Sequence, residues 1–195
     1  MPQTFIDNWI KTKGWKLHDH QIKMIQSGAS GSSSLLIAPT GGGKTLAGFL
    51  PSIIELNAYP TNSLHTIYIS PLKALTVDVA RNLLNPLSEM GLKITVETRT
   101  GDTPQSKRQR QRKSPPNILL TTPESLALLI SYPDSATIFQ ELRCVIIDEL
   151  HALAPTKRGD LLSLALARLN KWSPKARRVG LSATIPYPEE MAEYL

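Results

Sequence analysis

Short apolar runs alternate with helical patterns along this chain of 195 residues. Six runs rich in aliphatic and β-branched residues are expected to form strands, at 35–38, 66–70, 94–98, 118–122, 144–148 and 178–183. Several are followed by a segment in which apolar residues recur every three or four positions. This alternation predicts βαβ units, and therefore an α/β fold in which helices cover both faces of a parallel sheet.

Two segments show the helical spacing clearly, at 72–83 and 159–172. Their expected buried faces consist of Leu72, Leu75, Thr76, Val79 and Leu83 in the first, and of Leu161, Leu164, Ala165 and Leu169 in the second. The first 30 residues also have a helical pattern, and the small polar residues at 28–34 predict a flexible linker. We therefore expect an N-terminal helical segment with its linker (1–34) and one α/β domain (35–195).

A glycine-rich loop follows the first predicted strand, in LLIAPTGGGKT (35–45). The backbone N–H groups of such a loop, and the helix N-terminus behind it, favour a polyphosphate. Lys44 is expected to neutralise the β- and γ-phosphates, and the Thr45 hydroxyl to ligate Mg²⁺. The usual G-x-x-x-x-G-K-[ST] pattern has a glycine where this chain has Ala38, and the alternative is a flexible turn with a solvated lysine. The residues expected to bind the nucleotide phosphates are Thr40, Gly41, Gly42, Gly43, Lys44 and Thr45.

An acidic pair follows another predicted strand, in VIIDELH (145–151). Because parallel strands present their carboxyl ends at one sheet edge, this pair is expected beside the glycine loop. Asp148 is then expected to hold the Mg²⁺ shell, and Glu149 to polarise an attacking water. The alternative is that these carboxylates only cap a helix. Lys44, Asp148 and Glu149 are the predicted catalytic residues.

Composition narrows the classes of protein. A hydrophobic content of 41% over 195 residues suffices for one core, and 22 Lys and Arg against 16 Asp and Glu favour a polyanionic partner. No apolar run approaches the roughly 18 residues of a membrane span, and the N-terminus lacks a signal-peptide pattern. We therefore expect no membrane partner and a cytoplasmic location. Cys144, the single cysteine, is expected to be a buried structural thiol.

Five motifs together resemble a known family. APTGGGKT (38–45), SPLKAL (70–75), TTPES (121–125), DELH (148–151) and SAT (182–184) occur in the order found in the first motor domain of superfamily 2 DExH-box helicases. The stretch from RTGD to SYPD (99–134) resembles the large helicase-related proteins, in particular their ligase-associated DEXH-box branch. The resemblance extends from about Gly14 onward, and it implies a RecA-like P-loop NTPase domain that uses ATP and Mg²⁺.

The resemblance also implies roles for residues outside the phosphate loop. Gln21 matches the glutamine that reads adenine, and Trp15 is expected either to stack nearby or to pack on the core. Ser182 and Thr184 match the motif that couples hydrolysis to the strand-binding face. His151 is expected to join that coupling, although a lone histidine more often only satisfies a polar contact.

For nucleic acid, the resemblance implies loops that hold the phosphates of one strand without reading bases. The matching residues are Pro71, Lys73, Arg99, Thr100, Gly101, Thr121, Thr122 and Pro123. Binding of single-stranded DNA is therefore expected to be independent of base sequence and to weaken with salt. A basic run is expected either to add electrostatic attraction or to form a solvated helix face; it consists of Lys107, Arg108, Arg110, Arg112 and Lys113.

The resulting hypothesis is an ATP-dependent translocase and helicase that moves 3′-to-5′ on single-stranded DNA, in DNA repair. The resemblance implies a second motor domain that supplies arginines, so residues 1–195 alone are expected to hydrolyse ATP poorly. It also suggests association with the nucleoid, and a DNA ligase and a nuclease as partners. The alternatives are an RNA-directed helicase of the same superfamily and a non-catalytic nucleotide-binding module. A GTPase is disfavoured because no N/T-K-x-D motif follows the loop.

Overall fold

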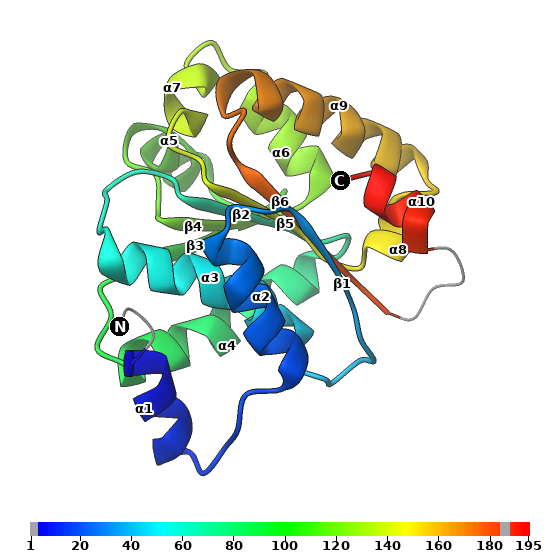
Figure 1. Ribbon diagram of the computed structural model, residues 1–195. Helices are drawn as coiled ribbons and strands as arrows, with labels where there is room; N and C mark the ends of the chain where they lie inside the picture. The colour runs from blue at the N-terminus through cyan, green and yellow to red at the C-terminus, as the bar shows by residue number, and fades with distance from the viewer. Residues whose placement is uncertain (1–3, 184–187) are drawn as a thin grey trace.

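A six-stranded parallel sheet forms the centre of the computed structural model, which describes residues 4–183 and 188–195 (Figure 1). The strand order is β1-β6-β5-β2-β4-β3. The strands are β1 (Ser34–Ile37), β2 (Thr66–Ile69), β3 (Val96–Arg99), β4 (Ile118–Thr121), β5 (Cys144–Ile147) and β6 (Arg177–Ser182). All six predicted strands are confirmed, with ends shifted by one or two residues.

Helices cover both faces of this sheet, as predicted. They are α1 (Thr4–Thr12), α2 (Asp19–Ala29), α3 (Lys44–Ala58), α4 (Lys73–Glu89), α5 (Gln105–Lys113), α6 (Pro123–Ile130), α7 (Ser135–Phe139), α8 (Leu150–Leu153), α9 (Lys157–Trp172) and α10 (Pro188–Glu193). Helices α6 to α9 pack on one face, and α2, α3 and α4 pack on the other, with α1 outside them (Figure 1).

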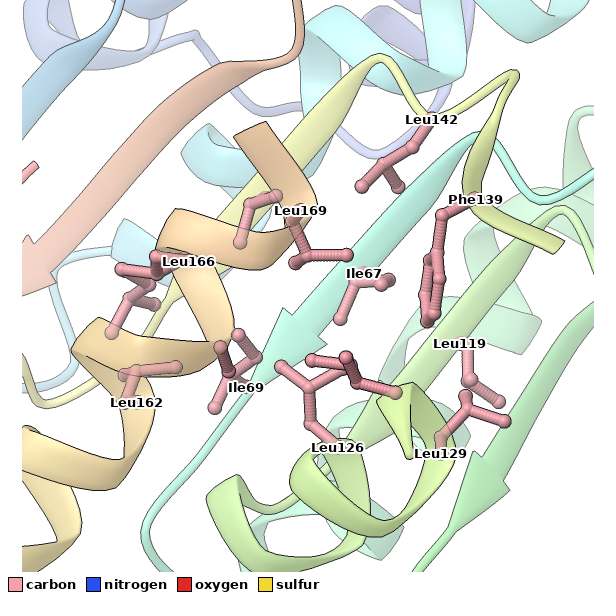
Figure 2. Packing of buried hydrophobic residues seen from close by; sticks show 14 of the residues in the cluster. Ile67, Ile69, Leu119, Leu126, Leu129, Phe139, Leu142, Leu162, Leu166 and Leu169 are labelled. Atoms are coloured by element: carbon pink, nitrogen blue, oxygen red, sulfur yellow. The ribbon is translucent and has the colours of Figure 1, made fainter. Parts of the chain in front are cut away.

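Side chains that alternate along each strand contribute to the apolar clusters on both faces of the sheet. In β2, Ile67 and Ile69 face the cluster formed with α6 and α9 (Figure 2). Tyr68, between them in sequence, faces the cluster beneath α3 and α4. Successive strand side chains point to opposite faces, so a strand covered on both sides reads as a continuous apolar run. Cys144 in β5 is fully buried, which confirms the predicted structural thiol, and burial raises the pKa of that thiol.

Two predicted core positions are wrong. Leu72 is exposed because it is the extended N-cap residue of α4 and lies outside the helix. Leu164 is 72% exposed. Ala165 and Leu169 of α9 are buried as predicted, and the other buried residues of this helix are Gly159, Leu162 and Leu166. The leucine-rich segment satisfies either spacing, and packing against α6 and the sheet selects between them.

The linker predicted at 28–34 is shorter in the structure, where residues 30–33 lie between α2 and β1. Gly28 belongs to α2, and a side chain there would collide with Pro51 of α3. The Ser30 hydroxyl donates to the Ser27 carbonyl at 2.8 Å, so the serines end the helix through hydrogen bonds. The division of the chain at 34/35 stays a prediction, although α1, α2 and α3 share one apolar cluster. Within the described ranges, no helix is long and apolar enough to cross a membrane.

Candidate nucleotide site and strand-binding face

The sheet register brings the glycine loop and the acidic pair to one edge. Ile37 at the end of β1 pairs with Ser182, and Ile147 at the end of β5 pairs with Gly180 on the other side of β6. The Ala38 N–H then donates to the Ser182 carbonyl at 3.2 Å. Residues 38–43, Asp148 and the end of β6 therefore lie together at the carboxyl edge, where open parallel sheets bind ligands.

The backbone of the loop requires glycine. Gly41 and Gly43 have φ angles of 81° and 73°, in the left-handed region that side chains disfavour. A Cβ on Gly42 would lie 3.1 Å from the Pro39 carbonyl oxygen. Gly43 is the N-cap residue of α3, so the positive end of that helix dipole meets the loop. These constraints argue against an arbitrary flexible turn.

Lys44 is the first residue of α3, and only 7% of it is exposed. Its Nζ donates to the Ala38 carbonyl at 2.7 Å and to the Pro39 carbonyl at 3.2 Å. Among the residues that the structure describes, no carboxylate pairs with this ammonium group. A buried cation with neutral partners alone favours an anion, so the alternative of a solvated lysine is wrong.

Asp148 directly follows β5 and is 6% exposed. Its Oδ1 accepts the Glu149 N–H at 2.9 Å, and its Oδ2 accepts a hydrogen bond from the hydroxyl of Tyr68 in β2. Burial, and then the charge of Asp148, raise the pKa of Tyr68 far above its usual range, so this hydroxyl remains a donor. Sequence reasoning missed Tyr68, and the only signal was one polar atom in the aliphatic run TIYIS.

Glu149 has an unusual backbone. Its φ and ψ are 49° and 43°, and within residues 4–183 and 188–195 no other non-glycine residue has a positive φ. Such a conformation costs free energy and is concentrated at functional sites. Glu149 is the N-cap residue of α8, but its side chain makes no capping hydrogen bond. Capping therefore does not explain this glutamate, and its carboxylate stays available for another role.

A histidine links the acidic pair to the end of β6. His151 Nδ1 lies 2.9 Å from Ser182 Oγ and accepts the Ala183 N–H at 3.4 Å, while its Nε2 lies 3.4 Å from Glu149 Oε2. Because a backbone N–H can only donate, Nδ1 is the acceptor and Nε2–H faces the carboxylate. The structure thus brings together three of the predicted coupling and catalytic residues. Thr184, the third predicted coupling residue, lies outside the described residues.

Gln21 lies in α2 against the phosphate loop. Its Oε1 accepts the His18 N–H at 2.9 Å, and its Nε2 donates to the Gly43 carbonyl at 3.4 Å. A cavity opens here, and Trp15 lines it and packs edge-to-face on Trp9 at 5.7 Å. The packing alternative for Trp15 is therefore confirmed, and stacking beside the adenine stays a prediction. The cavity is lined by Ile10, Trp15, Lys16, Leu17, His18, Gln21, Gly41, Gly43 and Leu46.

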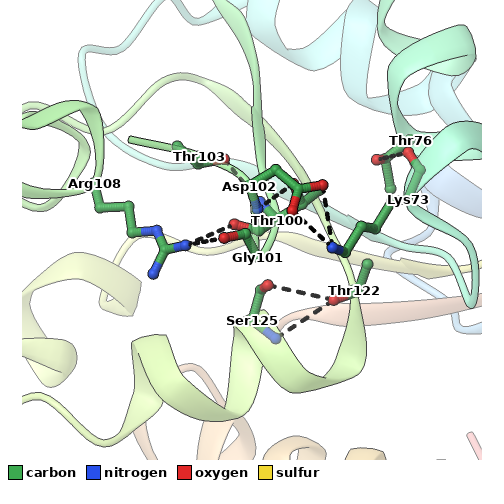
Figure 3. A network of polar contacts seen from close by, with 9 residues as sticks. All are labelled: Lys73, Thr76, Thr100, Gly101, Asp102, Thr103, Arg108, Thr122 and Ser125. Atoms are coloured by element: carbon green, nitrogen blue, oxygen red, sulfur yellow. Dashed lines mark hydrogen bonds and ion pairs between the residues drawn. The ribbon is translucent and has the colours of Figure 1, made fainter. Parts of the chain in front are cut away.

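A second polar region connects the ends of β2, β3 and β4 (Figure 3). Lys73 Nζ lies 2.9 Å from Asp102 Oδ1, and a Cβ on Gly101 would lie 3.2 Å from the same ammonium group. Thr122 is the N-cap residue of α6 and accepts the Ser125 N–H, with Pro123 as the first residue of that helix. Of the predicted strand contacts, Lys73, Gly101 and the N-terminus of α6 therefore lie close together, and Pro71 precedes α4 in the same loop.

Arg99 and Thr121 lie elsewhere than expected. Arg99 is among the largest fully buried side chains, and its guanidinium donates to the Arg108 carbonyl at 3.0 Å. The Thr121 hydroxyl donates to the Arg99 carbonyl at 2.7 Å. Burial lowers the pKa of Arg99. In this conformation neither side chain can contact a phosphate, because both support the backbone beneath the loop.

The basic run forms α5, and most of its charges are paired. Arg110 contacts Glu97 at 2.6 Å and Lys107 contacts it at 3.9 Å, while Arg112 contacts Asp134 at 2.8 Å. The guanidinium of Arg108 donates to the carbonyls of Thr100 and Gly101 at 3.2 and 2.5 Å. The run is therefore neither a simple solvated face nor a free basic patch, and Lys113 at its end is exposed.

Fold and site together define a class, the RecA-like P-loop motor domain: a parallel sheet with a glycine loop after β1 and an acidic pair after β5. The chain belongs to the DEAD/DEAH box helicase family, whose model matches residues 18–192. This membership confirms the predicted fold class and the recognised superfamily.

Three comparisons place the chain within that family. It is 46% identical over 181 residues to an Lhr helicase and probable uracil glycosylase of Mycolicibacterium smegmatis, covering 86% of this chain and 12% of that protein. It is 40% identical over 205 residues to the ATP-dependent helicase Lhr-Core of Methanocaldococcus jannaschii, covering 97% of this chain and 24% of that protein. The structure of Mycobacterium smegmatis helicase Lhr bound to ssDNA and AMP-PNP superimposes with a TM-score of 0.91, at 41% identity, over 100% of this chain and 27% of that one. The chain thus spans about a quarter or less of the lengths of these proteins.

Proposed function

We propose that residues 1–195 form the nucleotide-binding motor domain of an ATP-dependent helicase that translocates 3′-to-5′ on single-stranded DNA. The observation that carries this proposal is the buried Lys44 ammonium group, which has only loop carbonyls as partners and lies at the same sheet edge as Asp148. A buried cation, backbone N–H groups and a carboxylate at one edge suit a triphosphate with its metal ion.

The residues present fit Mg²⁺ and ATP. No group of three or more His, Cys, Asp or Glu side chains in the described residues could hold a metal ion by itself. Mg²⁺ in phosphoryl-transfer sites is typically held by one or two carboxylates together with substrate phosphates, which suits Asp148 with Thr45. When bound, Mg²⁺ would neutralise charge on the transferred phosphoryl group. Glu149 would orient the attacking water, and Gln21 and Trp15 would contact the adenine.

The strand-binding face supports a polyanionic partner. Lys73, Gly101 and the N-terminus of α6 form a polar region of cations, backbone amides and hydroxyls (Figure 3). Such groups contact phosphates and read no bases. A solved relative is bound to ssDNA, which favours DNA over RNA for this chain. Binding is expected to weaken with rising salt, because released counterions drive it.

The test is ATP hydrolysis by the protein expressed from its complete reading frame, with and without single-stranded DNA. Lys44→Ala is expected to lower the stimulated rate by about a hundredfold, because it removes a cation aimed at transition-state charge. Lys16→Ala is the matched control, since it removes an exposed lysine from the neighbouring cavity beside Gln21, and its rate should stay within about twofold. Equal rates in the two variants would exclude the assigned site. Stimulation by RNA alone would favour the RNA-directed alternative, and a wild-type protein without ATPase activity would favour a non-catalytic module.

Four further predictions rest on the family resemblance. These are a role in DNA repair, a DNA ligase and a nuclease as partners, a second motor domain that completes the ATP site, and a cytoplasmic location beside the nucleoid. Affinity purification of the tagged protein from its host, followed by mass spectrometry, tests the partners. Recovery of neither a ligase nor a nuclease would contradict that prediction.

A further inference from the structure

The loop at residues 100–102 is held from two sides. On one side, Arg108 of α5 donates to the Thr100 carbonyl at 3.2 Å and to the Gly101 carbonyl at 2.5 Å. On the other side, Lys73 of α4 contacts Asp102 at 2.9 Å. Figure 3 shows the two cations on opposite sides of the loop. Arg108 therefore differs from the other cations of α5, which contact carboxylates or solvent.

Peptide geometry determines where the backbone N–H groups of this loop point. In a trans peptide the C=O and the following N–H point in opposite directions. Because the carbonyls of Thr100 and Gly101 point toward Arg108, the N–H groups of Gly101 and Asp102 point away from it, toward the side of Lys73. The Asp102 N–H lies 3.4 Å from Thr100 Oγ1, a long hydrogen bond that a stronger acceptor can replace.

We infer that Arg108 is a positioning residue for DNA-strand binding by the 100–102 loop. It turns two carbonyls away from the bound strand so that the Gly101 and Asp102 amides face a phosphate. This inference rests on the proposed function. Carbonyl oxygens facing the strand would repel phosphate oxygens, so their orientation decides whether this loop attracts or rejects a polyanion. A guanidinium suits the task, because its Nη2 carries two N–H bonds in a fixed plane and donates to both carbonyls at once.

Two details of the contacts support an indirect role. Arg108 is half-buried, and its Nε is buried with no hydrogen-bond partner among the described residues, so this part of the guanidinium is shielded from a phosphate in solvent. The backbone carbonyl of Arg108 accepts from buried Arg99 at 3.0 Å, which fixes α5 against β3. The Thr103 hydroxyl, which accepts the Thr100 N–H at 2.9 Å, completes the loop. The guanidinium thus contacts the loop on the side opposite Lys73.

The experiment measures DNA-stimulated ATP hydrolysis by the protein from its complete reading frame, carrying Arg108→Ala, Arg108→Lys or Arg110→Ala. We expect Arg108→Ala to raise the half-saturating concentration of single-stranded DNA about tenfold, with the rate at saturating DNA and the KM for ATP unchanged. Arg108→Lys keeps the charge but replaces the planar guanidinium with a shorter side chain that ends in an ammonium group, and it should raise this concentration about threefold. Arg110→Ala removes the same charge from the same helix. Because the Arg110 side chain contacts Glu97 and not the 100–102 loop, this variant should change the half-saturating DNA concentration less than twofold.

Salt dependence separates positioning from direct contact. If Arg108 bound a phosphate itself, Arg108→Ala would lower the slope of log affinity against log salt by about 0.7. A positioning role lowers affinity and leaves the slope unchanged, because a lost amide contact releases no counterion. Equal effects of Arg108→Ala and Arg110→Ala, or a reduced slope, would overturn the inference. If Arg108→Ala does not fold, Arg108→Gln removes the same charge with a longer side chain and provides the same comparison. A wild-type protein that DNA fails to stimulate would reject the proposed function instead.

Discussion

The hydroxyl of Tyr68 donates a hydrogen bond to Asp148 Oδ2, and this contact joins the interior of β2 to the residue that follows β5. Tyr68 is fully buried, so its hydroxyl has no water to replace that partner. The contact holds the carboxylate that we assign to the metal shell.

Tyr68→Phe removes this donor and keeps the ring that packs on Phe49 at 5.3 Å. Loss of one buried hydrogen bond to a charged group is expected to lower the free energy of unfolding by about 1.5–3 kcal/mol. The Mg²⁺ concentration for half-maximal ATPase activity should rise several-fold, because Asp148 is less well oriented. Chemical denaturation and Mg²⁺ titration check the two effects. An unchanged Mg²⁺ requirement in a destabilised variant would show that Tyr68 supports only the fold.

His151 connects Glu149 to Ser182, with contacts of 3.4 and 2.9 Å. His151→Ala is expected to keep basal ATP hydrolysis within about threefold and to lose most of the stimulation by DNA. Ser182→Ala should act in the same way. If the two residues form one linkage, the double variant should be no worse than either single variant, giving a coupling free energy of about 1 kcal/mol or more. Additive losses, measured as ATPase rates with and without DNA, would contradict this linkage.

Asp102 pairs with Lys73, a cation that we propose contacts a strand phosphate. The two side chains are largely exposed, at 76% and 53%, so the ion pair itself stabilises the fold little. Asp102→Asn removes a negative charge from the strand-binding face and frees the ammonium group. Affinity for single-stranded DNA is expected to rise about threefold at low salt, and the gain should shrink at high salt.

The matched control is Asp78→Asn, which makes the same change on the exposed surface of α4, the helix that carries Lys73. Fluorescence anisotropy with a labelled oligonucleotide measures both variants. Equal gains in the two would assign the effect to net charge alone.

The amino edge of the sheet contains a partly buried cluster. Glu55 accepts from Arg177 at 2.6 Å and lies 3.1 Å from His65 Nε2. Burial alone would raise the pKa of Glu55, but the hydrogen bond from His65 and the charge of Arg177 outweigh it and lower that pKa below its ordinary value. A lowered folded-state pKa contributes stability above the unfolded value, and this contribution is lost as the pH falls through the folded value.

Glu55→Gln should therefore lower the free energy of unfolding at neutral pH by about 2 kcal/mol, and flatten its fall between roughly pH 5 and pH 3. Urea unfolding at a series of pH values measures this. Glu141→Gln is the control, because Glu141 is exposed and meets Arg143 at only 3.8 Å. A wild-type pH profile in Glu55→Gln would show that this ion pair does not contribute to acid unfolding.

Local chemistry made several features of the nucleotide site predictable. The glycines after β1 and the acids after β5 stand at strand ends in the sequence itself, and parallel pairing places strand ends at one edge. Gln21 and His151 could be assigned only through the resemblance, because a single polar residue carries no pattern. Arg99 was expected at the strand-binding face, but it is buried. Its burial depends on the elements packed above β3, and a single charged residue shows no periodicity from which that packing could be predicted.

The sequence by itself determined the order of strands and helices, the parallel sheet, and the presence of a phosphate loop and an acidic pair. These features could be predicted because the spacing of apolar residues and the positions of glycines are local properties of the chain. Tertiary structure alone decided that Tyr68 contacts Asp148 across 80 positions of sequence, that Glu149 adopts a left-handed backbone, and that Arg108 turns inward to the 100–102 loop. The physical reason is register: which polar atoms meet depends on how distant strands pair and which helix packs above them, and a chain read one segment at a time does not contain that pairing.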